Sequence, residues 1–161
     1  MPCGWRMLQT ANSADAPKSN PVDSGPTAAI EFPHGLPGFE SEREFVLAEP
    51  PSQSPLLFLQ SVRTPALSFL AIPVQTVEPD YELQLNPDDI TALGLDPDDL
   101  TAVAANLLAL ALLTVPENAP VTANLLAPVV VNLARSVAVQ SVRLDRRYSH
   151  CHPLCEAASC S

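Results

Sequence analysis

The sequence is poor in cationic side chains. It holds 8 Lys and Arg residues against 18 Asp and Glu residues, and its net charge is −10 at pH 7. No Lys or Arg occurs between Arg63 and Arg135. Binding to nucleic acid through phosphate neutralisation needs a clustered cationic surface. This class of function is therefore excluded.

Long runs without proline are also scarce, because the 161 residues include 18 prolines. Only residues 98–115 and 129–152 form long proline-free runs, whereas a helical bundle of this size needs about four. An all-helical fold is therefore excluded. A chain of this length can bury roughly two-thirds of its unfolded surface, which is enough for one core.

Cysteine is absent from the body of the chain. The four cysteines lie in the terminal segments, at Cys3, Cys151, Cys155 and Cys160, so a disulfide-built core is excluded. Residues 1–27 lack the apolar stretch of about seven or more residues that a signal peptide requires. Their polar composition, rich in Pro and Ser, predicts a disordered extension. We expect a cytoplasmic protein.

One long uncharged run is present, from Leu100 to Val115. It contains Asn106 and stops at Pro116, so it is shorter than the roughly 20 residues of a membrane span. The run predicts buried strand structure instead.

From residue 28 onward, short apolar runs alternate with Pro, Gly, Asn and Asp, which is typical of strands and turns. This pattern predicts an all-β fold: a small barrel-like domain of short antiparallel strands, with one or two helical turns, over residues 28–154. Residues 155–161 are predicted to form a flexible tail. The predicted strands are 28–32, 43–48, 56–62, 67–73, 81–85, 101–115 in one or two pieces, 121–131 and 137–144.

For two of these strands the sequence also predicts burial or a local irregularity. Tyr81, Leu83 and Leu85 alternate with polar residues, which predicts a half-buried strand. Near the end of the chain the apolar phase changes between Val139 and Val142, and this change predicts a β-bulge near residues 140–141.

A decapeptide is repeated in the middle of the chain, as NPDDITALGL from Asn86 and DPDDLTAVAA from Asp96. Both copies resemble helix starts, with Asn or Asp as N-cap, Pro in the first turn and two acids near the positive end of the helix dipole. Gly94 is suited to end the first helix. We expect a short helix over about residues 87–93.

Acidic side chains are concentrated in the cation-free stretch, which must therefore present a negative surface. Such a surface attracts basic partners and speeds their association. Capping of helices is an alternative role for the NPDD and DPDD acids, but no cap explains the acids around Tyr81, an aromatic residue suited to anchor a partner. The acids are Glu78, Asp80, Glu82, Asp88, Asp89, Asp96, Asp98, Asp99 and Glu117.

The sequence shows no pattern typical of an enzyme. It lacks a GxSxG elbow, a phosphate-binding glycine loop and an HExxH motif, and His34 is the one histidine in the body of the chain. Neither DPDD segment has the Gly and Glu of a calcium loop. We expect no catalysis and no cofactor.

The C-terminal segment HCHPLCEAASC leaves one metal alternative open. Its possible zinc donors lack the usual CxxC spacing, so we expect a tail without metal, with a zinc-binding module as the alternative. The donors are His150, Cys151, His152, Cys155 and Cys160.

The segment FPHGLPGFE combines two prolines with two glycines, which predicts a rigid, tightly turned loop. Phe32, Leu36 and Phe39 are its apolar pegs. The loop either closes one end of a barrel or offers a binding edge to a partner.

Several motifs together resemble the family of flagellar assembly factors called FliW. They occur in the order and rough spacing typical of that family and cover about residues 29–154. The motifs are IEFPHGLPGFE, FLQSV at 58–62, FLAIP at 69–73, PDYEL at 79–83, LTVPEN at 113–118, TANLLAPVVVN at 122–132, Gln140 and YSHCHPL at 148–154.

The resemblance implies a monomeric, non-catalytic β-barrel protein with two alternative partners. One is the C-terminal region of newly made flagellin, and the other is CsrA, a basic dimeric RNA-binding repressor of flagellin translation. Binding of the repressor would relieve its block and so couple flagellin synthesis to secretion. A flagellin chaperone without repressor control is the alternative function.

The residues divide between these two expected contacts by their chemistry. A basic repressor should contact acidic side chains, and flagellin should contact an apolar groove or strand edge. We expect the repressor at Glu78, Asp80, Glu82, Asp88 and Asp89, with Tyr81 as anchor. We expect flagellin at Phe32, Leu36 and Phe39.

Overall fold

The structure is a computed structural model that describes residues 29–50, 52–99 and 104–154. The predicted extension, residues 1–27, and the predicted tail, residues 155–161, lie outside the described residues. The elements are β1 (Ala29–Glu31), β2 (Glu44–Ala48), β3 (Leu57–Ser61), β4 (Ser68–Pro73), α1 (Val74–Val77), α2 (Pro87–Ala92), η1 (Pro97–Asp99), η2 (Ala104–Asn106), β5 (Leu107–Thr114), β6 (Thr122–Ala123), β7 (Val129–Asn132), β8 (Val137–Gln140) and β9 (His152–Pro153).

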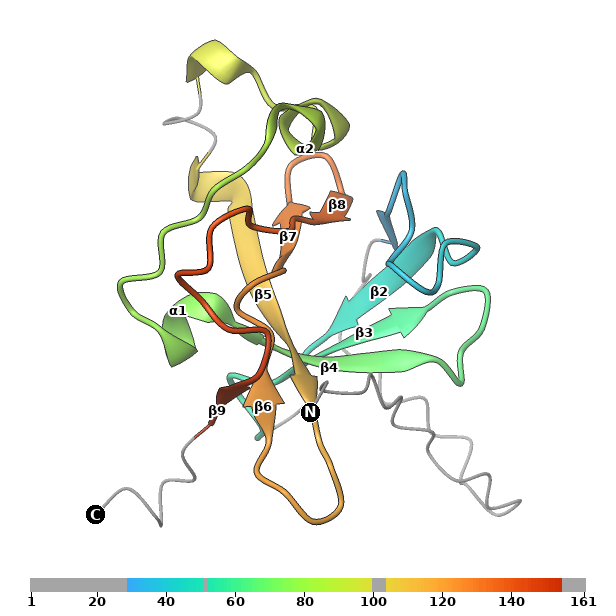
Figure 1. Ribbon diagram of the computed structural model, residues 1–161. Helices are drawn as coiled ribbons and strands as arrows, with labels where there is room; N and C mark the ends of the chain where they lie inside the picture. Colours follow the sequence, from blue (N-terminus) through green and yellow to red (C-terminus); the bar gives the residue numbers. More distant parts are fainter. Residues whose placement is uncertain (1–28, 51, 100–103, 155–161) are drawn as a thin grey trace.

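The strands form a closed barrel of seven strands, in the order β4-β3-β2-β1-β8-β7-β5, which closes where β5 pairs with β4. All neighbours in the barrel are antiparallel except β1 and β8, which are parallel. The far end of β5 continues into a small extension with β6 and β9, at the bottom of Figure 1. The predicted all-β, barrel-like fold is confirmed.

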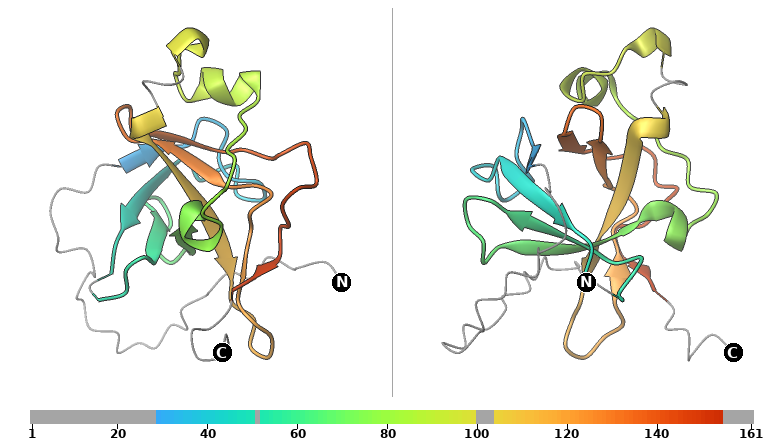
Figure 2. Two further views of the ribbon diagram at one scale, coloured as in Figure 1. Left: turned by 90° about the vertical axis from the view of Figure 1, so that its left-hand side faces the viewer. Right: turned by 180° about the vertical axis from the view of Figure 1, so that it is seen from behind.

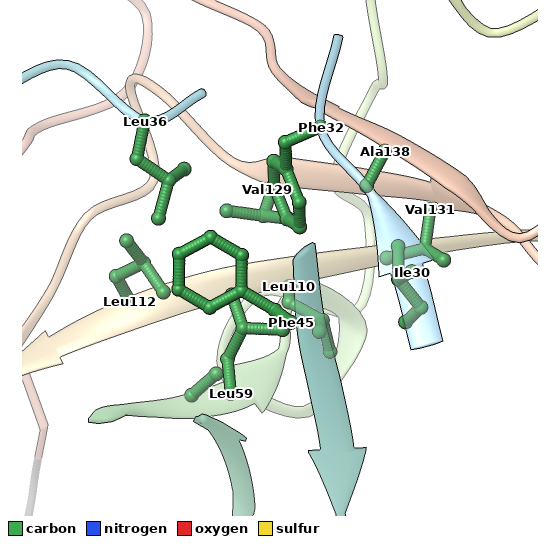
Figure 3. Packing of buried hydrophobic residues seen from close by; sticks show 11 residues of the cluster. Ile30, Phe32, Leu36, Phe45, Leu59, Leu110, Leu112, Val129, Val131 and Ala138 are labelled. Carbon is green, nitrogen blue, oxygen red and sulfur yellow. The ribbon is translucent and has the colours of Figure 1, made fainter. Parts of the chain in front are cut away.

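The barrel interior is filled by one apolar cluster to which all seven strands contribute (Figure 3). Phe45 lies near its centre and contacts Phe32 edge-on, with ring centroids 4.9 Å apart. Such pairs add to the stability that burial of the ring area supplies. The fully buried aliphatic members include Leu59, Leu110 and Val129.

Strands β5 and β7 are buried on both faces, which explains why their sequences are continuous apolar runs. Leu110 and Leu112 of β5 face the barrel interior, whereas Ala109 and Ala111 belong to a second cluster outside it. The chain between β4 and β5 covers this outer face. Figures 1 and 2 show it leaving the barrel at α1, rising to α2 and η1, and returning to β5.

The helix prediction for the first repeat is confirmed. Asn86 is the N-cap of α2, and its side-chain oxygen accepts a hydrogen bond of 2.8 Å from the Asp89 amide. Gly94 follows the helix with φ +65°, a conformation that glycine adopts without strain. The second repeat forms only the short 3-10 helix η1.

Two strand predictions are wrong. Residues 81–85 form no strand, because the alternation there reflects burial of Tyr81, Leu83 and Leu85 against the barrel and not backbone pairing. Strand β8 ends at Gln140, and no bulge changes its inward face. The predicted strand 121–131 is divided into β6 and β7, while the short elements α1 and β9 were not predicted.

The FPHGLPGFE loop closes one end of the barrel. Phe32 is 0% and Leu36 2% exposed, so these two apolar side chains fill the barrel end and offer no exposed surface to a partner. Phe39 is partly buried, with its ring centroid 5.3 Å from that of Phe69. Gly35 has φ +66°, and a Cβ there would lie 2.7 Å from the Cα of Glu40. The loop is therefore a tightly packed corner.

Replacement of a loop aromatic tests this packing. We expect Phe32→Ala to lower the free energy of unfolding by about 3–5 kcal/mol, because a fully buried ring leaves a cavity. Urea unfolding followed by circular dichroism measures the change. The matched control is Val62→Ala at an exposed apolar position, which should change stability by less than about 0.5 kcal/mol. Equal stability of both variants would contradict the packing described.

Candidate functional site

The segment that connects β4 to β5, the two strands that close the barrel, carries most of the acids of the cation-free stretch. We call its described residues, 74–99 and 104–106, the excursion. It carries every acid of the cation-free stretch except Glu117. Its apolar side chains, including Val74, Leu83 and Leu93, pack on the outer faces of the barrel strands. The excursion is thus fixed by burial on one side and displays acids on the other.

A buried arginine clamps the middle of the excursion. The side chain of Arg143 is only 1% exposed. Its guanidinium donates two hydrogen bonds to Asp145, of 2.9 and 2.7 Å, and a third to the backbone oxygen of Glu82. Because an arginine fork satisfies several acceptors at once, it can be buried without an unpaired donor.

Two tyrosines complete this clamp. Their rings are 4.4 Å apart between centroids, and the guanidinium carbon of Arg143 lies 4.8 Å from the Tyr148 centroid and 5.7 Å from that of Tyr81. The Tyr81 hydroxyl donates to the Leu125 oxygen at 2.7 Å, and the Tyr148 hydroxyl accepts from the Glu82 amide at 3.0 Å. Stacking and hydrogen bonds therefore tie residues 81–82 to the C-terminal segment.

The charges in the clamp shift the pKa of its members. Hydrogen bonds from Arg143 lower the pKa of Asp145, and the same bonds raise the pKa of Arg143 against the opposing effect of burial. Burial raises the pKa of Tyr81. Because the pKa of Asp145 is lower in the folded protein than in the unfolded chain, the Arg143–Asp145 pair contributes its full stabilisation above the usual Asp pKa of about 3.9. This contribution decreases as the pH falls from there through the lowered folded pKa.

The predicted repressor residues occupy different environments on the excursion. Tyr81 is 8% exposed and belongs to the clamp, so it offers little surface as an anchor. Glu82 pairs with Arg147, and Asp89 accepts a hydrogen bond of 2.6 Å from the Ser141 hydroxyl. Among the described residues, the carboxylates of Glu78, Asp80 and Asp88 have no ion pair or hydrogen bond.

The structure therefore spreads these acids along the excursion from α1 to α2 and places two arginines on it that the sequence did not indicate. Arg143 and Arg147 come from beyond the cation-free stretch and fold back on it. The sequence did contain a signal for the burial of Arg143. Ser141 and Arg143 continue the every-second-residue pattern that starts at Val139, a side chain that packs against the excursion. The predicted apolar pegs Phe32 and Leu36 lie in the barrel cluster, which is a separate part of the molecule.

The histidines and cysteines form no visible metal centre in the part of the chain that the structure describes. Cys155 and Cys160, two of the predicted zinc donors, lie outside that part. Cys151 is disulfide-bonded. Within the described ranges, no helix has the length and apolar character needed to cross a membrane.

The fold and this surface define a small closed β-barrel with an acidic segment clamped to its outside. The family model for the FliW protein matches residues 16–154. This match begins inside the predicted extension, so its boundary at residue 28 stays a prediction.

Curated relatives and a solved structure agree with this match. The flagellar assembly factor FliW of Heliobacterium modesticaldum is 34% identical over 86% of this chain and 87% of its own length. That of Desulfitobacterium hafniense is 36% identical over 87% and 89%. A crystal structure of the flagellar assembly factor FliW superposes with a TM-score of 0.69 at 31% identity, over 80% of this chain and 86% of that one. The chain belongs to the FliW family of flagellar assembly factors.

Removal of the buried guanidinium tests the clamp. We expect Arg143→Ala to lower the free energy of unfolding by about 2–4 kcal/mol, because it removes three charge-assisted hydrogen bonds and the contact of the buried guanidinium with two tyrosine rings. The Glu82 amide should also exchange its hydrogen faster. Urea unfolding and hydrogen exchange measure the two effects.

The control for this variant is Arg146→Ala, since the Arg146 side chain is exposed and has no hydrogen bond or ion pair within the described ranges. It should change stability by less than about 0.5 kcal/mol. If Arg143→Ala is as stable as this control, the clamp does not hold the excursion.

Proposed function

We propose that this protein is a non-catalytic regulatory binding protein of flagellar assembly. In this proposal it acts in the cytoplasm and binds two alternative partners, the repressor CsrA and newly made flagellin. Binding of the repressor frees flagellin translation, and binding of flagellin competes with it. Membership of the FliW family supports the flagellar part, because the curated relatives carry the name flagellar assembly factor.

The observation that carries the repressor contact is the acidic excursion. A protein that binds RNA needs a basic surface to neutralise phosphates. Glu78, Asp80 and Asp88 offer carboxylates that no described side chain neutralises, on a segment held in place by the clamp. Opposite potentials steer the two proteins together, and a fixed segment loses little conformational freedom on binding.

The flagellin contact needs a different surface. An amphipathic segment is held through its apolar side, in a groove or along a strand edge. Of the three loop residues predicted for this contact, only Phe39 retains partial exposure. We therefore propose flagellin as the second partner on the strength of the family, with Phe39 as the one loop side chain available to it.

Charge reversal on the excursion tests the repressor contact. We expect Asp80→Lys combined with Asp88→Lys to weaken repressor binding about tenfold or more at low salt, because two attractive charges become repulsive. The remaining affinity should depend less on salt. Calorimetric titration with purified CsrA at low and high salt measures both quantities, and flagellin binding should be retained.

Glu117→Lys is the matched control, since Glu117 is an exposed acid on the β5–β6 loop outside the excursion. It alters net charge without altering the proposed contact. If Glu117→Lys weakened repressor binding as much as the double variant, the effect would come from the overall charge and not from the proposed contact. A chain that binds flagellin but no repressor would favour the alternative, a flagellin chaperone without repressor control.

A further inference from the structure

Cys151 is held in a disulfide bond. The sequence has three other cysteines, Cys3, Cys155 and Cys160, and all three lie outside the described residues. The second sulfur therefore belongs to one of them. A sulfur in a disulfide is not a thiolate, so Cys151 cannot serve as a zinc ligand while the bond exists.

The chain is fixed on both sides of Cys151. Before it, the Ser149 oxygen accepts a hydrogen bond of 3.0 Å from the Leu125 amide. After it, β9 pairs with β6, and the Leu154 amide donates to the Val121 oxygen at 2.9 Å. The Cys151 amide itself donates to the Ser149 hydroxyl at 3.0 Å. Cys151 thus has a set position just before the outer strand of the β6–β9 extension (Figure 1).

Strand β9 has little support of its own. It consists of two residues, and within the described ranges it pairs with β6 alone. Tyr148 and Leu154, on either side of it, are only partly buried where they pack on the second apolar cluster. A cross-link at Cys151 reduces the conformational freedom that this segment gains when it opens. The disulfide therefore stabilises the closed segment.

The compartment of the proposed function bears on this bond. In the cytoplasm, thiol reductants keep most cysteines reduced, and the disulfides that do form there are usually transient or redox-sensing. Cys151 is only partly buried, and access to the sulfur is a condition for thiol–disulfide exchange. A bond at this position is therefore open to reversible reduction.

We propose that Cys151 and one of the other three cysteines form a redox switch on the β6–β9 extension. In the oxidised state the disulfide fastens the segment around β9, and in the reduced state this segment opens more often. The reactant is a low-molecular-weight thiol–disulfide couple such as glutathione. The inference goes beyond the proposed function and takes only the compartment from it.

The exchange balances without a metal or a further oxidant. One protein thiolate attacks the small disulfide and releases one small thiol, and the second cysteine then displaces the other small thiol from the mixed disulfide. Two protein thiols are thus oxidised to one disulfide. The small disulfide is reduced to two thiols, which carry the two protons. Reduction of the protein follows the same steps in reverse.

Redox titration of the full chain tests this proposal. The protein is equilibrated with mixtures of reduced and oxidised glutathione, its free thiols are alkylated, and mass spectrometry maps them. We expect Cys151 to pass reversibly from thiol to disulfide together with one other cysteine. The Leu125 and Leu154 amides should exchange their hydrogens about tenfold faster in the reduced protein, because the open segment is no longer cross-linked. The Val62 amide, which donates to Glu44 in the barrel, should not change.

Cys151→Ser should exchange like the reduced protein in every redox buffer. Replacement of each other cysteine by Ser supplies the matched controls, since one of these variants should behave like Cys151→Ser and the other two like the parent. The proposal is overturned if Cys151 keeps one state in all mixtures, if the Leu125 and Leu154 amides exchange equally fast in both states, or if the disulfide joins two chains.

Zinc added to the reduced protein tests the metal alternative. If the reduced chain takes up zinc and can then no longer be reoxidised, the cysteines are zinc ligands and the switch is overturned. None of these readouts involves CsrA or flagellin. Failure of the switch therefore leaves the proposed function standing, and failure of repressor binding leaves the switch standing.

Discussion

The pairing of β4 with β5 is the constraint on which the rest of the structure depends. It closes the barrel, and Pro73 and Leu110 face each other across it. The excursion leaves from the end of β4 and returns into β5, so closure fixes both of its ends. The outer faces of β5, β7 and β8 then need a cover, and the apolar side of the excursion supplies it. Closure of the barrel therefore also fixes the segment that displays the acids.

The C-terminal segment fixes the middle of the excursion. Arg143 reaches through to the Glu82 backbone while Asp145 and the tyrosines hold its guanidinium. A buried cation is stable only when its donors and its charge are satisfied together, and this geometry does both. The same inward turn of Ser141 and Arg143 forces Val142 and Leu144 outward. Val142 and Leu144 thus point away from the excursion and stay exposed.

The sequence predicted the local structure well, because short-range chemistry determines it. Proline spacing excluded an all-helical fold, short apolar runs between turn residues located β2, β3 and β4, and the cap at Asn86 located α2. It could not show that residues 81–85 lack a strand partner. An extended segment that buries every second side chain has the same apolar alternation whether or not its backbone pairs with another strand. It also could not show that Arg143 and Arg147 both contact Glu82, some sixty positions earlier, because that contact follows from the tertiary fold.

In the proposed complex the acids of residues 78–89 bind the repressor, while residues 141–148 hold this segment on the barrel. Hydrogen exchange of the full chain, free and saturated with CsrA, tests it most directly, since exchange slows where a partner covers or stabilises the backbone. We expect slower exchange in both segments together, with the loop at residues 32–40 unchanged. Slower exchange confined to that loop, with both segments unaffected, would show that the repressor binds elsewhere.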